Sequence, residues 1–421
     1  MDAEFSLYVG VDWATQTHRV CIMDAQGKIL LEQAIKHDGE AISSFLQALE
    51  SITRGGGQRV AVGIEVPRGP LVEAFLERNH AVFSINPKQL DRFRDRHSIA
   101  GAKDDRRDAW VVADSLRTDQ CCFRRVVLDS PVIIRLRELS RTEEDLQGDL
   151  HRTVNQLYQL LLRYYPQLLQ LASVPDEPWL WALLELAPTS PQGAKLTTAR
   201  LQELLDKHRI RRWSAEQVRE ILASPPLPLA PGSAQAVSEH ALWLLPQLRL
   251  LYNQRKQVAD QIQRLLGQMT ASELDHPDRQ AQPDVSLLLS IPGVGRIITA
   301  TLMAEGADPL AQRDYHALRA YAGIAPVTRQ SGKSKQVIMR HSCNPRLRNA
   351  FYHWARTSVQ NDERSKQHYA RLRHAGHSHG RALRGVADRL LAVLIAMLKS
   401  GKCYDPNRRS ATSTATPAAQ S

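Results

Sequence analysis

The chain lacks several features that mark whole classes of protein. Its five cysteines form no Cys-x-x-Cys pair and no Cys/His group at zinc-ligand spacing, which argues against a disulfide framework and a structural zinc. No stretch approaches eighteen apolar residues, and the N-terminus has no basic segment followed by an apolar one. Neither a membrane span nor a secretory signal is therefore predicted. We expect a cytoplasmic protein with reduced thiols and no membrane partner.

Length and charge give the first positive indications. With 421 residues, 43% hydrophobic and 24% charged, the sequence predicts a globular protein of two or three domains. From Tyr321 to the end there are 18 Lys and Arg against 4 Asp and Glu, whereas residues 1–320 hold 37 and 40. Such a concentration of positive charge is typical of a domain that binds a polyanion. A solvated basic face without a partner is the alternative.

Acidic residues stand at three separate points of the N-terminal part. Asp12 closes the apolar strand Leu7–Val11, Glu65 closes the apolar strand Val60–Ile64, and the cluster Asp104–Asp108 follows about forty residues later. Hard divalent cations such as Mg²⁺ bind several carboxylate oxygens from different elements, and phosphate chemistry often uses two such ions. The pattern makes the chain a candidate phosphoryl-transfer enzyme.

The predicted elements place these acids on one domain. Strands are expected at 5–12, 18–24, 28–35, 59–65 and 81–85, and helices at 40–51, 70–79 and 105–117. This βββαβαβα order fits a ribonuclease H-like α/β domain with helices on both sides of a mixed sheet. Asp105 and Asp108, three residues apart in a helix, would share a face, as would Asp104 and Asp108. Acidic residues at an exposed helix start are the alternative, since the helix dipole favours them.

The middle of the chain has a coiled-coil pattern. Leucines recur at three- and four-residue steps over 134–165, with breaks at Glu143 and Thr153, and again over 236–269, where Pro246 should kink or restart the helix. Pairing within the chain and pairing between chains both remain open. The Pro-rich segment 224–228 indicates a turn or linker. The tryptophans of this region, Trp179, Trp181 and Trp243, are expected in the core.

The C-terminal part is expected to be helical, with a helix-hairpin-helix-like segment at Leu287–Gly295. Gly293 and Gly295 would let the backbone approach a phosphate, although a glycine-rich connection without a ligand is an equal alternative. A polar loop, 328–335, and a basic helix through Arg346, Arg348 and Arg356 follow. The irregular spacing of His374, His377 and His379 favours a solvated or RNA-facing loop over a metal site. The composition of 404–421 predicts disorder.

Together, short motifs give a specific resemblance over about residues 5–360. They are Gly10-Val11-Asp12, Gly63-Ile64-Glu65, Lys103-Asp104-Asp105-Arg106-Arg107-Asp108-Ala109, Ile291-Pro292-Gly293-Val294-Gly295, Gln330-Ser331-Gly332 and Asn344-Pro345-Arg346-Leu347-Arg348. In combination they resemble the DEDD transposase family of insertion sequences, which is related to the pilin-gene invertases. The family pattern usually has Thr or Ser where this chain has Asp104, so Asp104 could be a spare ligand.

The resemblance implies roles for particular residues. It implies a RuvC-like domain in which Asp12, Glu65, Asp105 and Asp108 bind Mg²⁺, and a C-terminal transposase domain whose nucleophile is Ser331. It further implies a structured non-coding bridge RNA that pairs with donor and target DNA, and assembly as a dimer or tetramer through the coiled coil. The expected division is a RuvC-like domain (1–125), a coiled-coil domain (126–280), a transposase domain (281–403) and a tail (404–421).

A serine hydroxyl is a weak nucleophile at neutral pH and needs a base or a metal nearby. We hypothesise that Ser331 attacks the DNA backbone to give a covalent phosphoserine, with the scissile phosphate held by neighbouring basic residues. Nucleic-acid contacts are assigned to Arg329, Lys333, Lys335, Arg340, Arg346, Arg348, Gly293 and Gly295. The main alternative is a Mg²⁺-dependent nuclease of the Holliday-junction-resolvase type that activates water. A non-catalytic nucleic-acid-binding protein is the third possibility.

Overall fold

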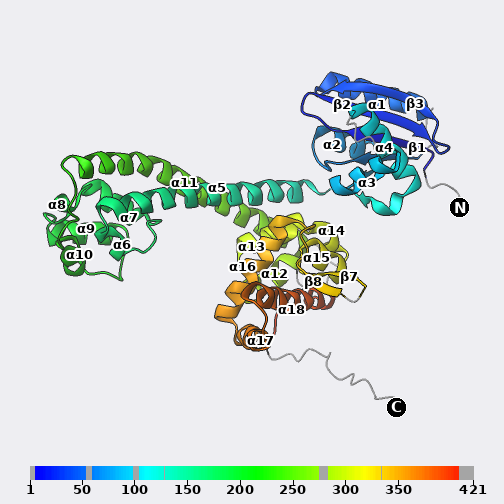
Figure 1. Ribbon diagram of the computed structural model, residues 1–421. Helices are drawn as coiled ribbons and strands as arrows, with labels where there is room; N and C mark the ends of the chain where they lie inside the picture. Colours follow the sequence, from blue (N-terminus) through cyan, green and yellow to red (C-terminus); the bar gives the residue numbers. More distant parts are fainter. Residues whose placement is uncertain are drawn as a thin grey trace, which may run out of the picture. The chain divides into compact units, whose positions relative to one another are not determined.

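The computed structural model describes residues 5–53, 59–97, 104–127, 129–274, 283–332 and 334–406. The chain divides into two units, Met1–Asp129 and Ser130–Ser421. The first unit contains a six-stranded sheet with the strand order β3-β2-β1-β4-β5-β6 (Figure 1). The strands are β1 (Leu7–Asp12), β2 (Thr17–Asp24), β3 (Ile29–Lys36), β4 (Val60–Ile64), β5 (Ala81–Ser84) and β6 (Arg124–Arg125). Strands β1, β4 and β5 run parallel, whereas β2, β3 and β6 are antiparallel to the strands they pair with.

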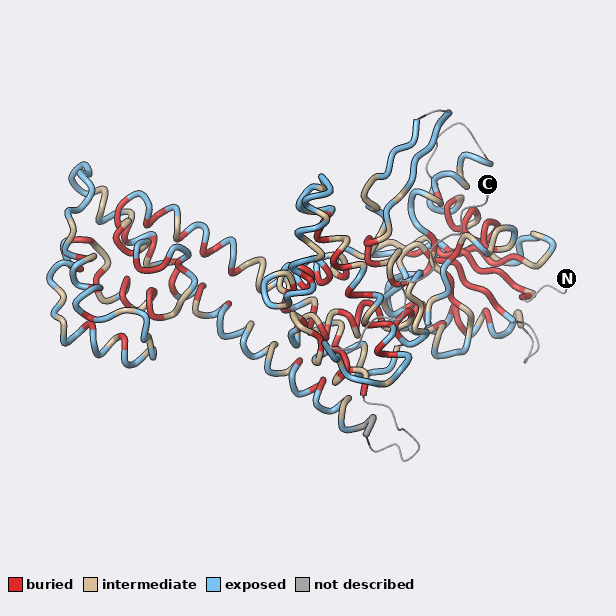
Figure 2. Tube along the Cα trace, turned by 90° about the horizontal axis from the view of Figure 1, so that it is seen from below, coloured by how far each residue is buried: buried red, intermediate tan, exposed pale blue. Residues whose placement is uncertain are grey.

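Helices cover both faces of this sheet. They are α1 (Gly39–Thr53), α2 (Pro70–Glu77), α3 (Pro87–His97) and α4 (Asp105–Thr118), followed by the 3₁₀ helix η1 (Gln120–Cys122). Apolar residues of β1 and β4 pack against α1 and α2 on one face, and against α3 and α4 on the other. The central strands are buried along their length (Figure 2), because a strand covered on both faces needs a continuous apolar run.

The second unit is built around two long helices, α5 (Pro131–Tyr164) and α11 (Ser233–Leu274). They pair antiparallel within the chain: Leu136, near the start of α5, packs with Ile262 and Leu265, near the end of α11 (Figure 1). The predicted breaks in the leucine pattern do not interrupt α5. Glu143 is buried there and accepts a hydrogen bond of 2.8 Å from Arg255 of α11.

The structure departs from two sequence expectations about α11. Of the kink or restart expected at Pro246, the restart is wrong: the helix runs through this position without a break, and the proline lies exposed while Leu245 and Leu248 beside it are buried. Packing of the apolar face thus outweighs the loss of one backbone hydrogen bond. Trp243 is 74% exposed instead of lying in the core, because the buried leucines occupy a different stripe of the helix.

Five short helices between α5 and α11 form a cap over one end of the pair. They are α6 (Gln167–Leu171), α7 (Pro178–Leu186), α8 (Ser190–Gly193), α9 (Thr198–Lys207) and α10 (Ala215–Leu222). Trp179 and Trp181 are buried in its core, as expected. The indole N–H of Trp181 donates to the carbonyl of Pro175 at 2.8 Å, so its polar atom is satisfied.

The remaining helices form a second apolar core with one hairpin on its surface. They are α12 (Asp284–Leu289), α13 (Arg296–Glu305), α14 (Ala307–Ala311), α15 (Tyr315–Tyr321), α16 (Pro345–Asn361), α17 (Glu363–His374) and α18 (His379–Ser400), with strands β7 (Val327–Ser331) and β8 (Ser334–Ile338). The described residues of the polar stretch 328–335, which was expected to be a loop, therefore belong to an antiparallel hairpin. Positions 407–421 of the predicted disordered tail lie outside the described residues. Within the described ranges, no helix is both long and apolar enough to span a bilayer.

Candidate functional site

Two glycines let α4 lie directly on the backbone of the sheet. Gly10 of β1 and Gly63 of β4 are partners in the parallel register. A Cβ atom at Gly10 would lie 1.9 Å from the carbonyl oxygen of Ala109, and one at Gly63 would lie 2.7 Å from Cγ1 of Val112. Since only hydrogen fits in these gaps, both positions require glycine. The close approach fixes α4 over β1 and β4.

The four predicted acidic residues gather where α4 begins. Asp12 lies two residues beyond the first glycine and Glu65 two residues beyond the second, so by strand alternation both side chains leave on the α4 side of the sheet. Asp105 and Asp108 occupy the first turn of α4. Asp108 is buried, Asp12 and Glu65 are half-buried, and Asp105 is exposed. The alternation of side chains along the strands and the position of the two aspartates in the first helical turn thus place all four carboxylates at one end of the domain.

The pKa of Asp12 reflects the nearby carboxylates. Burial, followed by the negative charges of Asp108, Asp105 and Glu65, raises the pKa of Asp12 to about 6, against a smaller opposing effect of Arg94. The three carboxylates are therefore close enough to Asp12 to disfavour its ionised form. Relief of such repulsion by a divalent cation is a recognised property of metal-binding carboxylate groups.

Arg94 of α3 is the prominent residue that sequence reasoning missed. Its Nε donates to Oδ1 of Asp108 at 2.6 Å and its Nη2 donates to Oδ2 at 2.8 Å. The helix itself was not predicted, although Asn86-Pro87 is a helix-start signal: the Asn86 side chain accepts from the backbone N–H of Lys88 at 3.0 Å, and proline suits the first helical position.

Asp104 has a local structural role. It is the N-cap of α4, and its side chain accepts a hydrogen bond from the backbone N–H of Arg106 at 3.2 Å. Asp and Ser or Thr are all good N-cap residues. Capping therefore accounts for Asp104 at a position where Thr or Ser was expected from the resemblance.

The four carboxylates suit Mg²⁺ in donor chemistry and charge, since hard cations prefer oxygen ligands. In the part of the chain that the structure describes, however, no three His, Cys, Asp or Glu side chains are close enough together to hold a metal ion. Arg94 engages both oxygens of Asp108, which would have to be released before Asp108 could serve as a ligand. The residues thus fit the ion, but their side chains are not pre-arranged around it.

Ser331 lies at the end of the β7–β8 hairpin in the second unit. It pairs with Ser334 across the strands, and both are exposed. Gly332 follows with φ of 54°, a backbone conformation that two-residue hairpin turns require and that glycine adopts without strain. The hydroxyl is therefore presented to solvent on a projecting hairpin. The four carboxylates belong to the other unit.

The predicted nucleic-acid residues have different environments. Arg329 and Lys335 are exposed on the hairpin strands, Arg340 and Arg348 are half-buried, and Lys333 lies outside the described residues. Gly295 has open space around it, whereas a Cβ at Gly293 would meet Ser358 Oγ at 2.6 Å. Gly293, with φ of 82°, is therefore needed for packing of the α12–α13 turn against α16.

The comparison with known proteins identifies the chain's relatives. A transposase family model named for the DEDD enzymes of IS110 matches residues 9–166, and the model of the transposase IS116/IS110/IS902 family matches residues 285–370. A protein of Streptomyces coelicolor, named as the candidate mini-circle transposase for IS117, is 32% identical over 96% of both chains. The chain belongs to this family of transposases.

Other relatives agree. The candidate transposase y4uE of Sinorhizobium fredii is 44% identical over 51% of this chain and 60% of its own length. An uncharacterised 42 kDa protein of the insertion element IS900 of Mycobacterium paratuberculosis is 25% identical over 97% of this chain and 98% of its own. The family matches include the four acidic positions in the first model and Ser331 in the second.

In this transposase the Asn344-Pro345-Arg346 motif joins helices of the C-terminal region. Asn344 caps α16, its side-chain oxygen accepting from the backbone N–H of Arg346 at 2.9 Å, and its amide donates to Glu305 at 2.8 Å. Glu305 also accepts from Nε of Arg141 in α5 at 2.8 Å. Burial pushes the pKa of Glu305 upward, but these hydrogen bonds and the neighbouring charges outweigh burial and hold it below its ordinary value.

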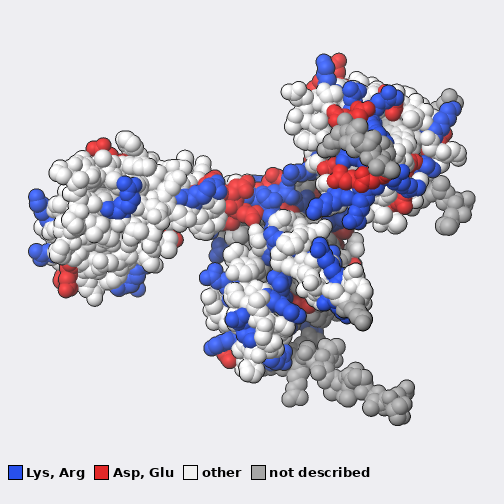
Figure 3. All heavy atoms as spheres, in the orientation of Figure 1, with Lys and Arg blue, Asp and Glu red and all other residues white. Residues whose placement is uncertain are grey.

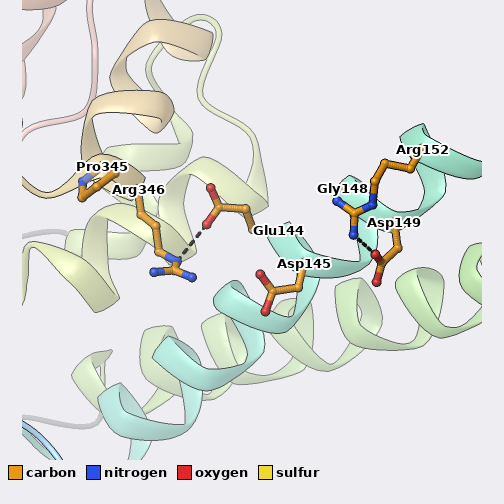
Figure 4. A pocket seen from close by; sticks show the side chains of 7 residues that line it. All are labelled: Glu144, Asp145, Gly148, Asp149, Arg152, Pro345 and Arg346. Atoms are coloured by element: carbon orange, nitrogen blue, oxygen red, sulfur yellow. Dashed lines mark hydrogen bonds and ion pairs between the residues drawn. The ribbon is translucent and has the colours of Figure 1, made fainter. Parts of the chain in front are cut away.

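Arg346 lines a cavity of about 600 Å³ with acidic residues of α5 (Figure 4). Its Nε lies 2.8 Å from Oε2 of Glu144, an ion pair without ideal hydrogen-bond angles. Asp149, on the far side of the cavity, pairs with Arg152. Glu144 therefore partly neutralises the predicted nucleic-acid contact at Arg346.

Proposed function

We propose that this transposase cuts and joins DNA strands through a covalent phosphoserine on Ser331, assisted by Mg²⁺ held by Asp12, Glu65, Asp105 and Asp108. The observation that carries the proposal is the electrostatic convergence of three carboxylates on a half-buried Asp12. Carboxyl groups whose pKa values are shifted by neighbouring charges are more common at functional sites than elsewhere, and a bound cation would relieve the repulsion among these four.

A ribonuclease H-like, or RuvC-like, assignment of the N-terminal unit is part of the proposal. Support comes from the strand order, in which β1 lies between an antiparallel β2–β3 pair and the parallel strands β4 and β5. Asp12 ends the central strand and Glu65 follows its parallel neighbour, so two acids come from adjacent strands and two from α4. We retain 1–125, 126–280, 281–403 and 404–421 as the proposed domain division.

The chemistry requires the Ser331 hydroxyl to lose its proton as its oxygen attacks phosphorus. A new Ser331 Oγ–P bond forms, the bond from phosphorus to the leaving DNA oxygen breaks, and that oxygen takes up a proton. A bound divalent cation would stabilise the charge on the non-bridging oxygens. The exposed side chains of Arg329 and Lys335 would hold the same phosphate. The diester bond energy is conserved on the serine for rejoining.

The proposed partners are donor and target DNA and a structured bridge RNA that pairs with both. The region after Tyr321 has 18 basic and 4 acidic residues, and this excess of positive charge supports a polyanion partner. Basic side chains are widespread over the α16–α18 region in Figure 3. We further propose a homo-oligomer, a dimer or a tetramer, in which the carboxylates of one subunit and Ser331 of another form one active site.

The test is a search for a protein–DNA adduct. The full chain, purified with its copurifying RNA, is incubated with donor and target DNA and Mg²⁺, then denatured and separated by electrophoresis. Wild type should give an adduct that Ser331→Ala abolishes. Ser334→Ala is the matched control, because Ser334 is the cross-strand partner of Ser331 and is also exposed, and it should retain the adduct. Asp105→Asn should abolish the adduct without loss of the fold, since Asp105 is exposed.

The outcome also decides between the two enzyme classes. Mg²⁺-dependent cleavage without an adduct, unaffected by Ser331→Ala, would establish the resolvase-like nuclease instead. An adduct that persists in Ser331→Ala would remove the nucleophile assignment while leaving the family membership intact.

A further inference from the structure

The base of the β7–β8 hairpin closes over a small basic cavity. Its volume is about 210 Å³, and its lining includes Arg319, Arg340, His377, Arg381, Arg384 and Asp388. Since one water occupies roughly 30 Å³ in the liquid, a phosphodiester group fits. Residues of β8, of the α17–α18 connection and of the first turns of α18 thus converge on one hollow.

The single carboxylate of the cavity wall is already engaged. Arg319 donates from Nε to Oδ1 of Asp388 at 2.7 Å and from Nη2 to Oδ2 at 2.8 Å, and the Tyr315 hydroxyl donates to Oδ1 at 2.6 Å. Asp388 therefore neutralises Arg319 and has little capacity left for the other guanidinium groups.

Arg381 and Arg384 have no carboxylate partner among the described residues. Arg384 directs Nη1 to the thioether sulfur of Met339 at 3.3 Å, a weak acceptor that cannot balance a charge. Burial and the charge of Arg381 lower the pKa of Arg384, although an arginine remains protonated. Within the described ranges, Arg340 donates only to the carbonyl of Ala325, at 3.3 Å. Three cations thus face one cavity with no carboxylate from the described part of the chain to compensate them.

We propose that this cavity, lined by Arg340, Arg381 and Arg384, binds a backbone phosphate of the nucleic-acid strand that reaches Ser331. Guanidinium groups bind phosphate oxygens through pairs of parallel hydrogen bonds. Because the three arginines line a concave site and not a flat surface, the site favours one phosphate over several dispersed contacts. That the ligand is a nucleic-acid phosphate rests on the proposed function, whereas the location of the site rests on the cavity alone.

The hairpin sets the distance between the cavity and the serine. Val327 at its base and Ser331 at its end are four residues apart on β7, about 13 Å at the usual rise of a strand. A strand that lies along the hairpin would therefore place the phosphate in the cavity about 13 Å from the phosphate at Ser331. The cavity would then fix the register of the strand on the hairpin.

The test uses the full chain and a fluorescein-labelled single-stranded DNA 12-mer, with affinity measured by anisotropy at several salt concentrations. Arg381→Gln and Arg384→Gln should each weaken binding about tenfold and reduce the slope of log K against log salt by about 0.7, the value for one phosphate on a single strand. Arg389→Gln is the control, since Arg389 is exposed on the same helix outside the cavity, and its slope should not change. Arg384 is half-buried, so the neutral variant Arg384→Gln can fail to fold. In that case Arg384→Lys, which retains the charge, takes its place.

Inorganic phosphate supplies a readout that is independent of catalysis. When phosphate replaces chloride at equal ionic strength, it should displace the 12-mer from wild type and from Arg389→Gln, but not from Arg381→Gln. An RNA 12-mer of the same sequence shows whether the phosphate comes from DNA, from RNA or from either. If Arg381→Gln and Arg389→Gln behave alike with every probe, the cavity proposal is wrong. Phosphate-sensitive binding without a Ser331 adduct would instead disprove the proposed function alone.

Discussion

Arg94 and Asp108 form a doubly hydrogen-bonded ion pair, with separations of 2.6 Å and 2.8 Å, at the point where acidic residues of the N-terminal unit meet. The side chains are 18% and 7% exposed, so the pair is largely removed from water. Among the described residues, Arg94 is the cation hydrogen-bonded to this acidic group, and it also pairs with Asp91. A metal ion that binds there must compete with it.

Arg94→Gln should lower the free energy of unfolding by about 3–5 kcal/mol in the presence of EDTA, because it leaves the buried Asp108 charge without its partner. Excess Mg²⁺ should recover part of that loss. Arg96→Gln is the control: Arg96 pairs with Asp119 at 3.0 Å on the surface, and its loss should cost less than about 1 kcal/mol. Equal effects in urea unfolding would show that the Arg94 pair has no special role.

Gly10→Ala should destabilise the N-terminal unit by several kcal/mol, because its Cβ would overlap the Ala109 carbonyl oxygen at 1.9 Å and force α4 off the sheet. Gly39→Ala should be near neutral, since nothing lies within 4 Å of a Cβ there. Urea unfolding followed by circular dichroism measures both. A stable, fully active Gly10→Ala would contradict the described contact between α4 and β1.

Asp12 should make stability depend on pH in the absence of a divalent cation. Its pKa of about 6 in the folded protein exceeds the ordinary value of 3.8, so the folded state binds the proton more tightly. The stabilisation is complete below about pH 4 and is lost as the pH rises through 6. In EDTA, the free energy of unfolding should fall between pH 4 and 7 by on the order of 2 kcal/mol more in wild type than in Asp12→Asn. Parallel pH profiles would argue against the convergence of charges on Asp12.

Glu305→Ala should cost about 3–5 kcal/mol, because Arg141 and Asn344 both lose a buried hydrogen-bond acceptor. Glu138→Ala removes the other, exposed partner of Arg141, which lies 3.6 Å away, and should cost under about 0.5 kcal/mol. Thermal unfolding of the two variants provides the comparison. If they unfold together, Glu305 does not connect α5, α13 and α16 as described.

The sequence was informative where residues act through local pattern. Apolar runs ending in Asp12 and Glu65 predicted β1 and β4 and the points where they end, because a buried strand shows in the sequence as a short apolar run. Helix α3 was missed because its one buried residue is Leu90, which leaves no periodic signal. The β7–β8 hairpin was missed for a similar reason: its strands are exposed and polar, so they show no alternation.

Contacts between distant segments could not be predicted in the same way. Nothing in the local sequence of α3 pairs Arg94 with Asp108, and nothing near Arg384 shows that it shares a cavity with Arg340, 44 positions earlier. Trp243 was misplaced because its side chain is apolar, although the stripe formed by Leu244, Leu245 and Leu248 turns it outward. The side of the helix on which Trp243 lies, and not its residue type, determines its exposure.

The paired glycines beneath α4 have a mechanical consequence. Where a helix rests on side chains, substitutions can lift, tilt or slide it by small steps, but at Gly10 the main chain of β1 meets the main chain of α4 and leaves no room for such a step. Loops around the domain can therefore vary in length without altering the separation of Asp12 from Asp105 and Asp108. An engineer seeking to widen that separation would have to rebuild the two strands themselves.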